Sequence, residues 1–476
     1  MDISILYFLT QADCTIIRHL TIIYAMTFLF PPAPLPKFNR NSFAVMKSSE
    51  NHLLPKQTVA LQSLLAWFGP DSATREQIAL VSMPTGSGKT GVMACLPYFL
   101  GSIGLIDQPL PTGNPSYRFD KPILVIAPDL EIAKQLERQL SVSKEGSIDE
   151  TFLVRRGIVP EDNIRDILPV AKKIESTSDL KDQHSLQMTG DLIIANAQKF
   201  LLPGWELELP DNMFRLVVVD EAYHHPAKTW RRIVQKFNSQ AQVVFFTATP
   251  YRSDGKKVLE DTPLAYHLPL RDAVREGIIR KTNFEELEPI NDLQHFEFRN
   301  RDIYDGKEIH DMGRMVTVLQ RVKSLLDSKN KDQQLPGGVQ HMAIAIAKNV
   351  NYANRLLDLW NAIYPNDTAE TYYSEKPGYE KVRIMAKLKN NELRLVIVVA
   401  MLLEGFDHPP ISIAAITCKI SSGLKFAQFV GRAQRIYRGQ EGTEENGQAD
   451  IITHVEYEQR QRYVDLIKER LIPKDQ

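Results

Sequence analysis

Two series of short apolar runs, separated by helical patterns, constrain the fold of this 476-residue chain more than any other feature. The first series comprises Gln77–Met83, Pro122–Ala127, Asp191–Ala195, Leu216–Val219 and Val243–Thr247. The second comprises Met342–Ala347, Leu395–Val399, Ile411–Thr417 and Asp450–His454. The runs are nearly continuous in Val, Ile, Leu, Phe and Ala, so each predicts a strand that is covered on both faces, as in a parallel sheet.

Helical patterns lie between these runs. The segment Leu130–Leu140 places Ile132, Leu136 and Leu140 on one face and has Asp129 in the N-cap position. Alternating strands and helices predict an α/β fold with doubly wound parallel sheets. We expect one such domain at residues 46–280 and a second at 336–476, joined by a connector at 281–335. The connector carries one helical apolar pattern: Met315, Val318, Leu319, Val322, Leu325 and Leu326.

The charge balance and the cysteines exclude several classes of protein. With 57 Lys and Arg against 58 Asp and Glu, the net charge is −1, which argues against a wholly basic nucleic-acid binder. A local basic cleft on a neutral protein stays compatible with it. Three widely spaced cysteines (Cys14, Cys95 and Cys418) cannot form a disulfide framework, which favours a reducing, cytoplasmic compartment.

Residues 1–45 differ from the rest of the chain. They are largely apolar, but the longest uncharged run, His19–Phe30, is shorter than the ~20 residues of a spanning helix. It ends at prolines from Pro31 onward, and the start lacks the basic region of a secretory signal. Three interpretations stay open: a natural start at Met46, a peripheral helix, and a membrane anchor, which is the least favoured.

A phosphate-binding loop follows the first apolar run. Met83–Thr90 reads MPTGSGKT and is followed by a helical pattern. Glycines such as Gly86 and Gly88 let successive backbone N–H groups face phosphate oxygens at a helix N-terminus. In such loops the lysine, here Lys89, reaches the β- and γ-phosphates, and the hydroxyl of Thr90 binds Mg²⁺. We therefore expect Thr85, Gly86, Ser87, Gly88, Lys89 and Thr90 to bind ATP.

Two acidic residues follow another apolar run, at the strand end where ligands bind in such sheets. Asp220 is expected to hold Mg²⁺, partly through water, since this ion keeps much of its hydration. Glu221 is expected to orient or deprotonate the water that attacks the γ-phosphate.

A basic helical face lies in the second domain. Within Gln428–Arg435, the spacing places Gln428, Arg432 and Arg435 on one side of a helix. Apolar residues, among them Phe429 and Val430, take the other side. Two guanidiniums that project together suit the charge that develops during phosphoryl transfer, so these residues are predicted to be catalytic.

Together these stretches resemble the motif set of superfamily-two helicases and translocases, in order and in spacing, from about Leu53 to Tyr437. The residues at Thr247–Gly255 and Glu404–Asp407 are most similar to the branch that includes type III restriction motor subunits. The resemblance implies two tandem RecA-like domains with ATP in the cleft between them.

The resemblance also implies roles for lesser motifs. Gln57 matches the glutamine that contacts adenine, and Gly405 and Asp407 match further ATP contacts. Nucleic-acid contacts are implied for Pro128, Asn196 and Glu404, and coupling of hydrolysis to movement for Tyr223, His224, Thr247 and Thr249. The family usually has Asp or His where Tyr223 stands, which puts coupling in doubt rather than ATP binding.

Three functions are compatible with these features. The leading one is an ATP- and Mg²⁺-dependent helicase or translocase, acting on DNA rather than RNA. The second is the motor subunit of a restriction or defence complex, with a nuclease or methyltransferase partner and no role at a membrane. The third is a nucleotide-dependent clamp on nucleic acid with weak turnover, which Tyr223 suggests.

Overall fold

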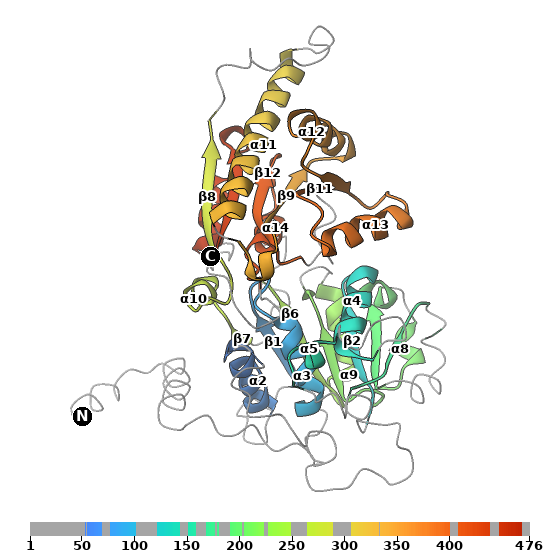
Figure 1. Ribbon diagram of the computed structural model, residues 1–476. Helices are drawn as coiled ribbons and strands as arrows, with labels where there is room; N and C mark the ends of the chain where they lie inside the picture. The colour runs from blue at the N-terminus through green and yellow to red at the C-terminus, as the bar shows by residue number, and fades with distance from the viewer. Residues whose placement is uncertain are drawn as a thin grey trace, which may run out of the picture.

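All the apolar runs predicted as strands form strands of two parallel sheets in the computed structural model of the protein (Figure 1). The predicted α/β fold with two doubly wound domains is therefore confirmed. The structure describes residues 53, 55–68, 77–100, 121–142, 151–158, 168–176, 179, 191–201, 204–222, 227–248, 264–288, 306–332, 334–399, 408–437 and 447–468. Residues 1–45 lie outside this part of the chain, so the three interpretations of that segment stay open.

In the described part of the chain, the first sheet has seven parallel strands in the order β3-β4-β2-β5-β6-β1-β7. Their bounds are β1 Ile78–Ser82, β2 Ile123–Ala127, β3 Ala171–Lys173, β4 Leu192–Asn196, β5 Leu216–Val219, β6 Gln242–Thr247 and β7 Leu264–His267. The helices of this domain are α2 Pro55–Phe68, α3 Lys89–Leu100, α4 Leu130–Leu140, α5 Phe152–Arg155, η4 Ala197–Phe200, α8 Trp205–Glu208, α9 Ala227–Phe237 and α10 Leu270–Arg275. As predicted, the side chain of Asp129 caps α4 by accepting a hydrogen bond from the backbone N–H of Ile132 at 2.8 Å.

Successive residues of these strands pack into different cores, because side chains alternate across a sheet. In β2, Leu124 packs into a cluster with Trp230 of α9, whereas Val125 packs into a cluster with Leu136 of α4. Both faces of the first sheet are therefore covered, which explains why its inner strands are apolar throughout.

Among the residues that the structure describes, the second sheet has six parallel strands in the order β10-β11-β9-β12-β13-β8. Their bounds are β8 Lys281–Leu287, β9 Met342–Ala347, β10 Ala369–Tyr372, β11 Leu395–Val399, β12 Ile411–Ile416 and β13 Gln448–His454. The helices of this domain are α11 Gly306–Asp332, η8 Pro336–Gly338, α12 Val350–Ile363, α13 Gly378–Lys389, α14 Gly423–Ala433, η9 Val455–Tyr457 and α15 Arg460–Ile467.

The segment predicted as a connector, residues 281–335, differs from that expectation. It supplies β8 to the edge of the second sheet, paired with β13, and α11 to one face of that sheet. The predicted apolar pattern of α11 is observed, because Met315, Val318 and Leu319 are fully buried against the sheet. The sequence does not predict β8, because this strand is polar and only partly buried and therefore lacks an apolar run. We therefore propose that the second domain begins near Lys281.

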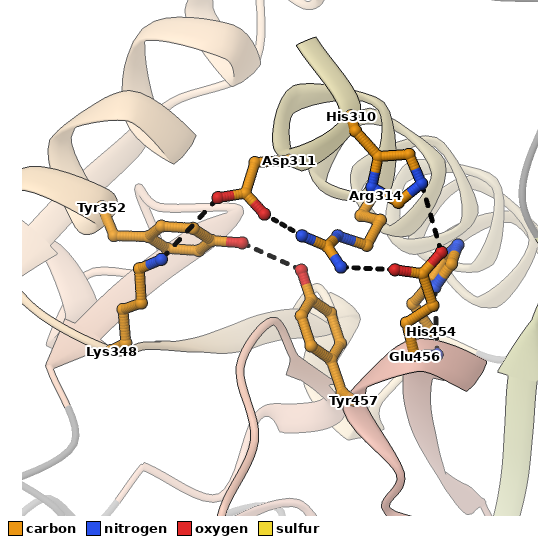
Figure 2. A network of polar contacts seen from close by, with 8 residues as sticks. All are labelled: His310, Asp311, Arg314, Lys348, Tyr352, His454, Glu456 and Tyr457. Atoms are coloured by element: carbon orange, nitrogen blue, oxygen red, sulfur yellow. Dashed lines mark hydrogen bonds and ion pairs between the residues drawn. The ribbon is translucent and has the colours of Figure 1, made fainter. Parts of the chain in front are cut away.

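A polar network ties α11 to the carboxyl ends of the neighbouring strands (Figure 2). Arg314 of α11 binds Asp311 and also Glu456, which follows β13. Beneath them, the hydroxyls of Tyr352 and Tyr457 share a hydrogen bond of 2.8 Å, and burial raises the pKa of both phenols. These contacts fix the long helix to the end of the sheet.

A buried ion pair holds the middle of this domain. The ammonium of Lys329 in α11 lies 2.9 Å from a carboxylate oxygen of Asp450 in β13, and both side chains are less than a tenth exposed. Because Lys329→Met leaves a buried carboxylate without its cation, we expect the free energy of unfolding to fall by about 3–5 kcal/mol. Denaturant unfolding measures this change. Adding Asp450→Asn to this variant should restore most of the lost free energy of unfolding. A loss below about 1 kcal/mol in Lys329→Met would mean that the pair stabilises the domain no more than a surface ion pair does.

Candidate active site

The phosphate-binding loop lies between β1 and α3, as its sequence predicts. Gly86 and Gly88 have φ angles of 82° and 93°, a region that residues with a β-carbon rarely adopt. The Ser87 hydroxyl donates to the carbonyl of Pro84 at 2.6 Å, so this side chain shapes the loop instead of facing the cavity. Lys89 and Thr90 form the first turn of α3 and both face the cavity.

The lysine of this loop contacts the acidic pair that follows β5. The ammonium of Lys89 lies 3.3 Å from Oε1 of Glu221 and donates to the carbonyl of Met83 at 3.3 Å. Glu221 has a φ of 48°, and its N–H donates to Oδ1 of Asp220 at 2.9 Å. Its second carboxylate oxygen is buried and has no hydrogen-bond partner among the residues that the structure describes. A strained, half-satisfied carboxylate beside a lysine is a feature of functional sites rather than of stable cores.

The basic residues of the second domain face the same space. Gln428 and Arg432 lie on α14, which ends at Ala433, and Arg435 follows the C-cap Gln434. Arg435 is thus beyond the helix, where it forms an antiparallel bridge with Ile279, which corrects the prediction that all three residues share a helical face. Burial lowers the pKa of Arg435 to about 10, and the attraction of Glu221 opposes this shift, so the guanidinium is charged at neutral pH.

The two domains meet closely around these residues. A β-carbon placed on Gly86 would lie 2.8 Å from Cγ of Arg435, and one placed on Gly431 would lie 2.8 Å from Cβ of Thr85. Beside this contact is a cavity of about 320 Å³. It is lined from the first domain by Gln57, Thr85, Gly86, Gly88, Lys89, Thr90, Asp220 and Glu221, and from the second by Pro409, Gln428, Arg432, Arg435 and Ile436. The predicted phosphate-loop, acidic and basic residues therefore share one cavity.

Gln57 borders the loop from α2. Its side chain is buried, and its amide nitrogen donates to the carbonyl of Gly88 at 2.7 Å. A β-carbon placed on Gly91 would lie only 2.3 Å from that nitrogen and 2.5 Å from Cζ of Phe152. In the described arrangement Gln57 thus braces the loop at Gly88 and lines the cavity.

Gly91→Ala should weaken nucleotide binding, because its β-carbon would displace Gln57 and press on Phe152. Alanine is favoured over glycine in a helix by up to ~1 kcal/mol, but its β-carbon would drive Gln57 away from Gly88. Losing this partly buried hydrogen bond should cost about 1–3 kcal/mol, or about 5- to 150-fold in affinity for a fluorescent ATP analogue. Gly378→Ala in α13 is the matched control, since a β-carbon there meets no atom within 4 Å. Equal affinities in the two variants would contradict the role assigned to Gln57.

Several cavity residues were not predicted from the sequence. Gln135 and Gln139 line it from α4, and Phe152, Arg155 and Arg156 line it from the region of α5. The Leu130–Leu140 helix was recognised, but nothing in its pattern distinguishes cavity-lining glutamines from solvent-facing ones. The α5 residues follow no recognisable motif, so only the folded chain brings them to the site.

The remaining predicted residues lie around this site or outside the described chain. Pro128 follows β2 and Asn196 ends β4, and these strand ends are neighbours because Ala127 pairs with Asn196. Thr247 ends β6 and is buried, and its carbonyl accepts a hydrogen bond from the N–H of Met83 at 2.9 Å. Six predicted residues lie outside the described residues: Tyr223, His224, Thr249, Glu404, Gly405 and Asp407.

Two further findings describe the surroundings. Among the described residues, no three acidic, histidine or cysteine side chains converge as a metal site would require. None of the helices that the structure describes has the length and apolarity needed to span a membrane.

The chain is similar to known helicases and restriction-enzyme subunits. Residues 50–252 match the family model "Type III restriction enzyme, res subunit". "Putative helicase 22" of Sulfolobus islandicus filamentous virus is 24% identical over 231 residues, which cover 46% of this chain and 40% of that protein. "Putative mitochondrial ATP-dependent helicase irc3" of Schizosaccharomyces pombe is 21% identical over 408 residues, covering 84% of this chain and 58% of that protein. The chain thus spans about half the length of these relatives.

A solved structure shares the fold of both domains. The ATP-dependent Type ISP restriction-modification enzyme LlaBIII, solved bound to DNA, superposes with a TM-score of 0.60. It is 16% identical, and the match covers 88% of this chain and 30% of the enzyme. At this identity the likeness concerns the fold, and it extends over both sheets.

Proposed function

We propose that this chain, which is a superfamily-two helicase-fold protein related to type III restriction motor subunits, is an ATP-dependent nucleic-acid helicase or translocase. It would hydrolyse ATP to ADP and phosphate. The observation that carries the proposal is the shared cavity, in which Lys89 and Glu221 of one domain face Arg432 and Arg435 of the other. A site divided in this way links the nucleotide to the relative position of the two domains.

The residues of the cavity divide the chemistry of hydrolysis. The loop amides around Gly86 and Gly88 and the ammonium of Lys89 would hold the phosphates. Once Lys89 binds phosphate instead of Glu221, that carboxylate is free to orient the attacking water. Arg432 and Arg435 would stabilise the charge that develops on the transferred phosphoryl group.

The cavity also suits a magnesium ion. The hydroxyl of Thr90 and the carboxylate of Asp220 line it together, and both are oxygen ligands of the kind Mg²⁺ prefers. Two protein ligands are enough because this ion keeps several waters and binds nucleotide phosphates. When bound, Mg²⁺ would neutralise phosphate charge, and Asp220 and Thr90 would set its position.

Nucleic acid would lie along the carboxyl ends of the strands. Pro128 and Asn196 are proposed contacts in the first domain, and Glu404 in the second. Phosphate contacts hold a strand with little sequence preference, so recognition of a particular sequence would come from elsewhere. ATP would draw the domains together and hydrolysis would release them, and the grip on the strand would alternate with this cycle.

DNA is the proposed substrate. The supporting observations are the family model of a restriction enzyme subunit and the likeness in fold to a restriction-modification enzyme solved on DNA. A protein of similar fold has also been solved on RNA, so the choice of substrate needs a direct experiment.

The test is the dependence of nucleic-acid binding on the nucleotide state. Single-stranded DNA, duplex DNA and RNA of equal length carry a fluorophore, and anisotropy gives each affinity with a non-hydrolysable ATP analogue, with ADP and without nucleotide. A motor must bind its track differently in these states, by about 5- to 150-fold for ordinary coupling. Affinities that do not change with nucleotide would contradict the motor, and a preference for RNA would contradict the choice of DNA.

A second candidate function is the motor subunit of a restriction or defence complex. The match to the res subunit model favours it, and nuclease or methyltransferase partners would then supply recognition and cleavage. Co-purification with such a partner tests this version. The nucleotide-dependent clamp is the remaining alternative, and it would bind nucleic acid with ATP but release almost no phosphate.

A further inference from the structure

A buried arginine, Arg280, lies where the chain passes from the first domain to the second. Strands β1 to β7 belong to the first sheet and β8 to β13 to the second, so the chain crosses between His267 and Lys281. Arg280 is the last residue before β8 and is only 1% exposed. A charge so deeply buried needs a specific set of partners.

Arg280 hydrogen-bonds to carbonyls on two sides of the second domain. Its Nη1 donates to the carbonyls of Ile411 at 2.5 Å and Ala433 at 2.8 Å. Its Nη2 donates to the carbonyl of Pro409 at 2.9 Å. Its backbone N–H donates to the carbonyl of Gln434 at 2.6 Å. One residue thus joins the domain crossing, the start of β12 and the end of α14.

These contacts surround the two arginines that face the cavity. Ala433 follows Arg432 directly, and Gln434 precedes Arg435 directly. Ile279, next to Arg280, forms the antiparallel bridge with Arg435. Arg280 itself does not line the cavity, so any effect on the nucleotide must pass through its neighbours.

The chemistry of the contact requires arginine. The last carbonyls of a helix have no partners within it and carry partial negative charge, so a buried cation is favoured at the end of α14. A planar guanidinium donates in fixed directions from two nitrogens and can span Pro409 and Ala433 together. A lysine ammonium is a single point of charge and would satisfy only part of this set.

We infer that Arg280 is a positioning residue for ATP hydrolysis: it fastens the end of α14 to the domain crossing, and so holds Arg432 and Arg435 toward the phosphates. This inference rests on the proposed function of the cavity. The segment between His267 and Lys281 and the two arginines therefore move as one unit when the domains open and close.

The test separates positioning from stability. Arg280→Lys keeps the charge, and Arg280→Met removes charge and donors together, which leaves the carbonyls of Ile411, Ala433 and Pro409 without this donor and also lowers stability. Both should lower kcat for ATP by about 10- to 100-fold, as misplacement of catalytic groups does, and leave KM within about threefold. In an Arg435→Ala background, Arg280→Lys should lower kcat by a smaller factor than in the wild-type chain, because only Arg432 is left to be misplaced and residues that act through one another are not additive.

Lys329→Met is the matched structural control, because it weakens the same domain at a buried cation whose partners, Asp450 and Gln448, lie on β13 and do not line the cavity. Its kcat, measured well below its unfolding temperature, should stay near that of the wild type. A wild-type kcat in both Arg280 variants would overturn the inference, as would an undiminished effect in the Arg435→Ala background or an equal loss of kcat in Lys329→Met. A wild-type chain that does not hydrolyse ATP would overturn the proposed function and this inference together.

Discussion

Lys89→Ala is expected to abolish measurable ATP turnover, a loss of at least about 10³-fold. The ammonium is the cation of the phosphate-binding loop, and its present partner, Glu221, is the proposed water-orienting residue at 3.3 Å. Removing Lys89 would therefore remove a phosphate contact and also leave Glu221 without its ion pair. Phosphate release under saturating ATP measures the effect.

Lys236→Ala controls for the loss of a paired lysine in the same domain. Its ammonium lies 2.5 Å from Asp211, away from the cavity, so turnover should be unchanged in this variant. Undiminished turnover in Lys89→Ala would show that ATP is hydrolysed elsewhere and would overturn the assignment of the cavity.

Arg435→Ala should lower turnover by more than about 10²-fold while ATP affinity changes little, as is typical of an arginine finger. The guanidinium is charged despite its burial, and it lies in the field of Glu221 and against Gly86 of the loop. Its contribution should grow as charge develops on the γ-phosphate, so it should affect kcat more than binding.

Arg321→Ala serves as the control for this variant, because that arginine pairs with Glu285 at 2.9 Å in the same domain and neither residue lines the cavity. A separate binding measurement with a non-hydrolysable analogue is needed for each variant. If Arg435→Ala lost binding strongly but kept its turnover, the residue would hold the ground state of ATP instead.

The strands that the sequence predicts and the strands that it does not predict lie at different positions within the sheets. Those found are flanked by strands on both sides, and their residues are almost completely buried. Those missed, β3, β7, β8 and β10, are the four edge strands. Edge strands carry exposed or partly buried residues, as Lys281–Leu287 does, so they lack the continuous apolar run that marks a strand in the interior of a parallel sheet.

The residues of the candidate site also differ in whether the sequence alone can reveal them. Residues inside motifs, such as Lys89 and Arg432, could be predicted because the chemistry of phosphate requires their types and spacing. Arg435 lines the cavity, but helical periodicity could not reveal that α14 ends at Ala433. Arg280 carried no motif at all. Its role depends on contacts with residues more than a hundred positions away, which only the folded chain brings together.

The central claim is that ATP is hydrolysed in a cavity shared by the two domains and that nucleic acid drives this hydrolysis. The most direct test is steady-state phosphate release by the wild-type chain at saturating ATP and Mg²⁺, without nucleic acid and with single-stranded DNA, duplex DNA or RNA. We predict a rate that DNA increases, and no rate above background in Lys89→Ala. Release that no nucleic acid stimulates, or none above the Lys89→Ala background, would contradict the claim.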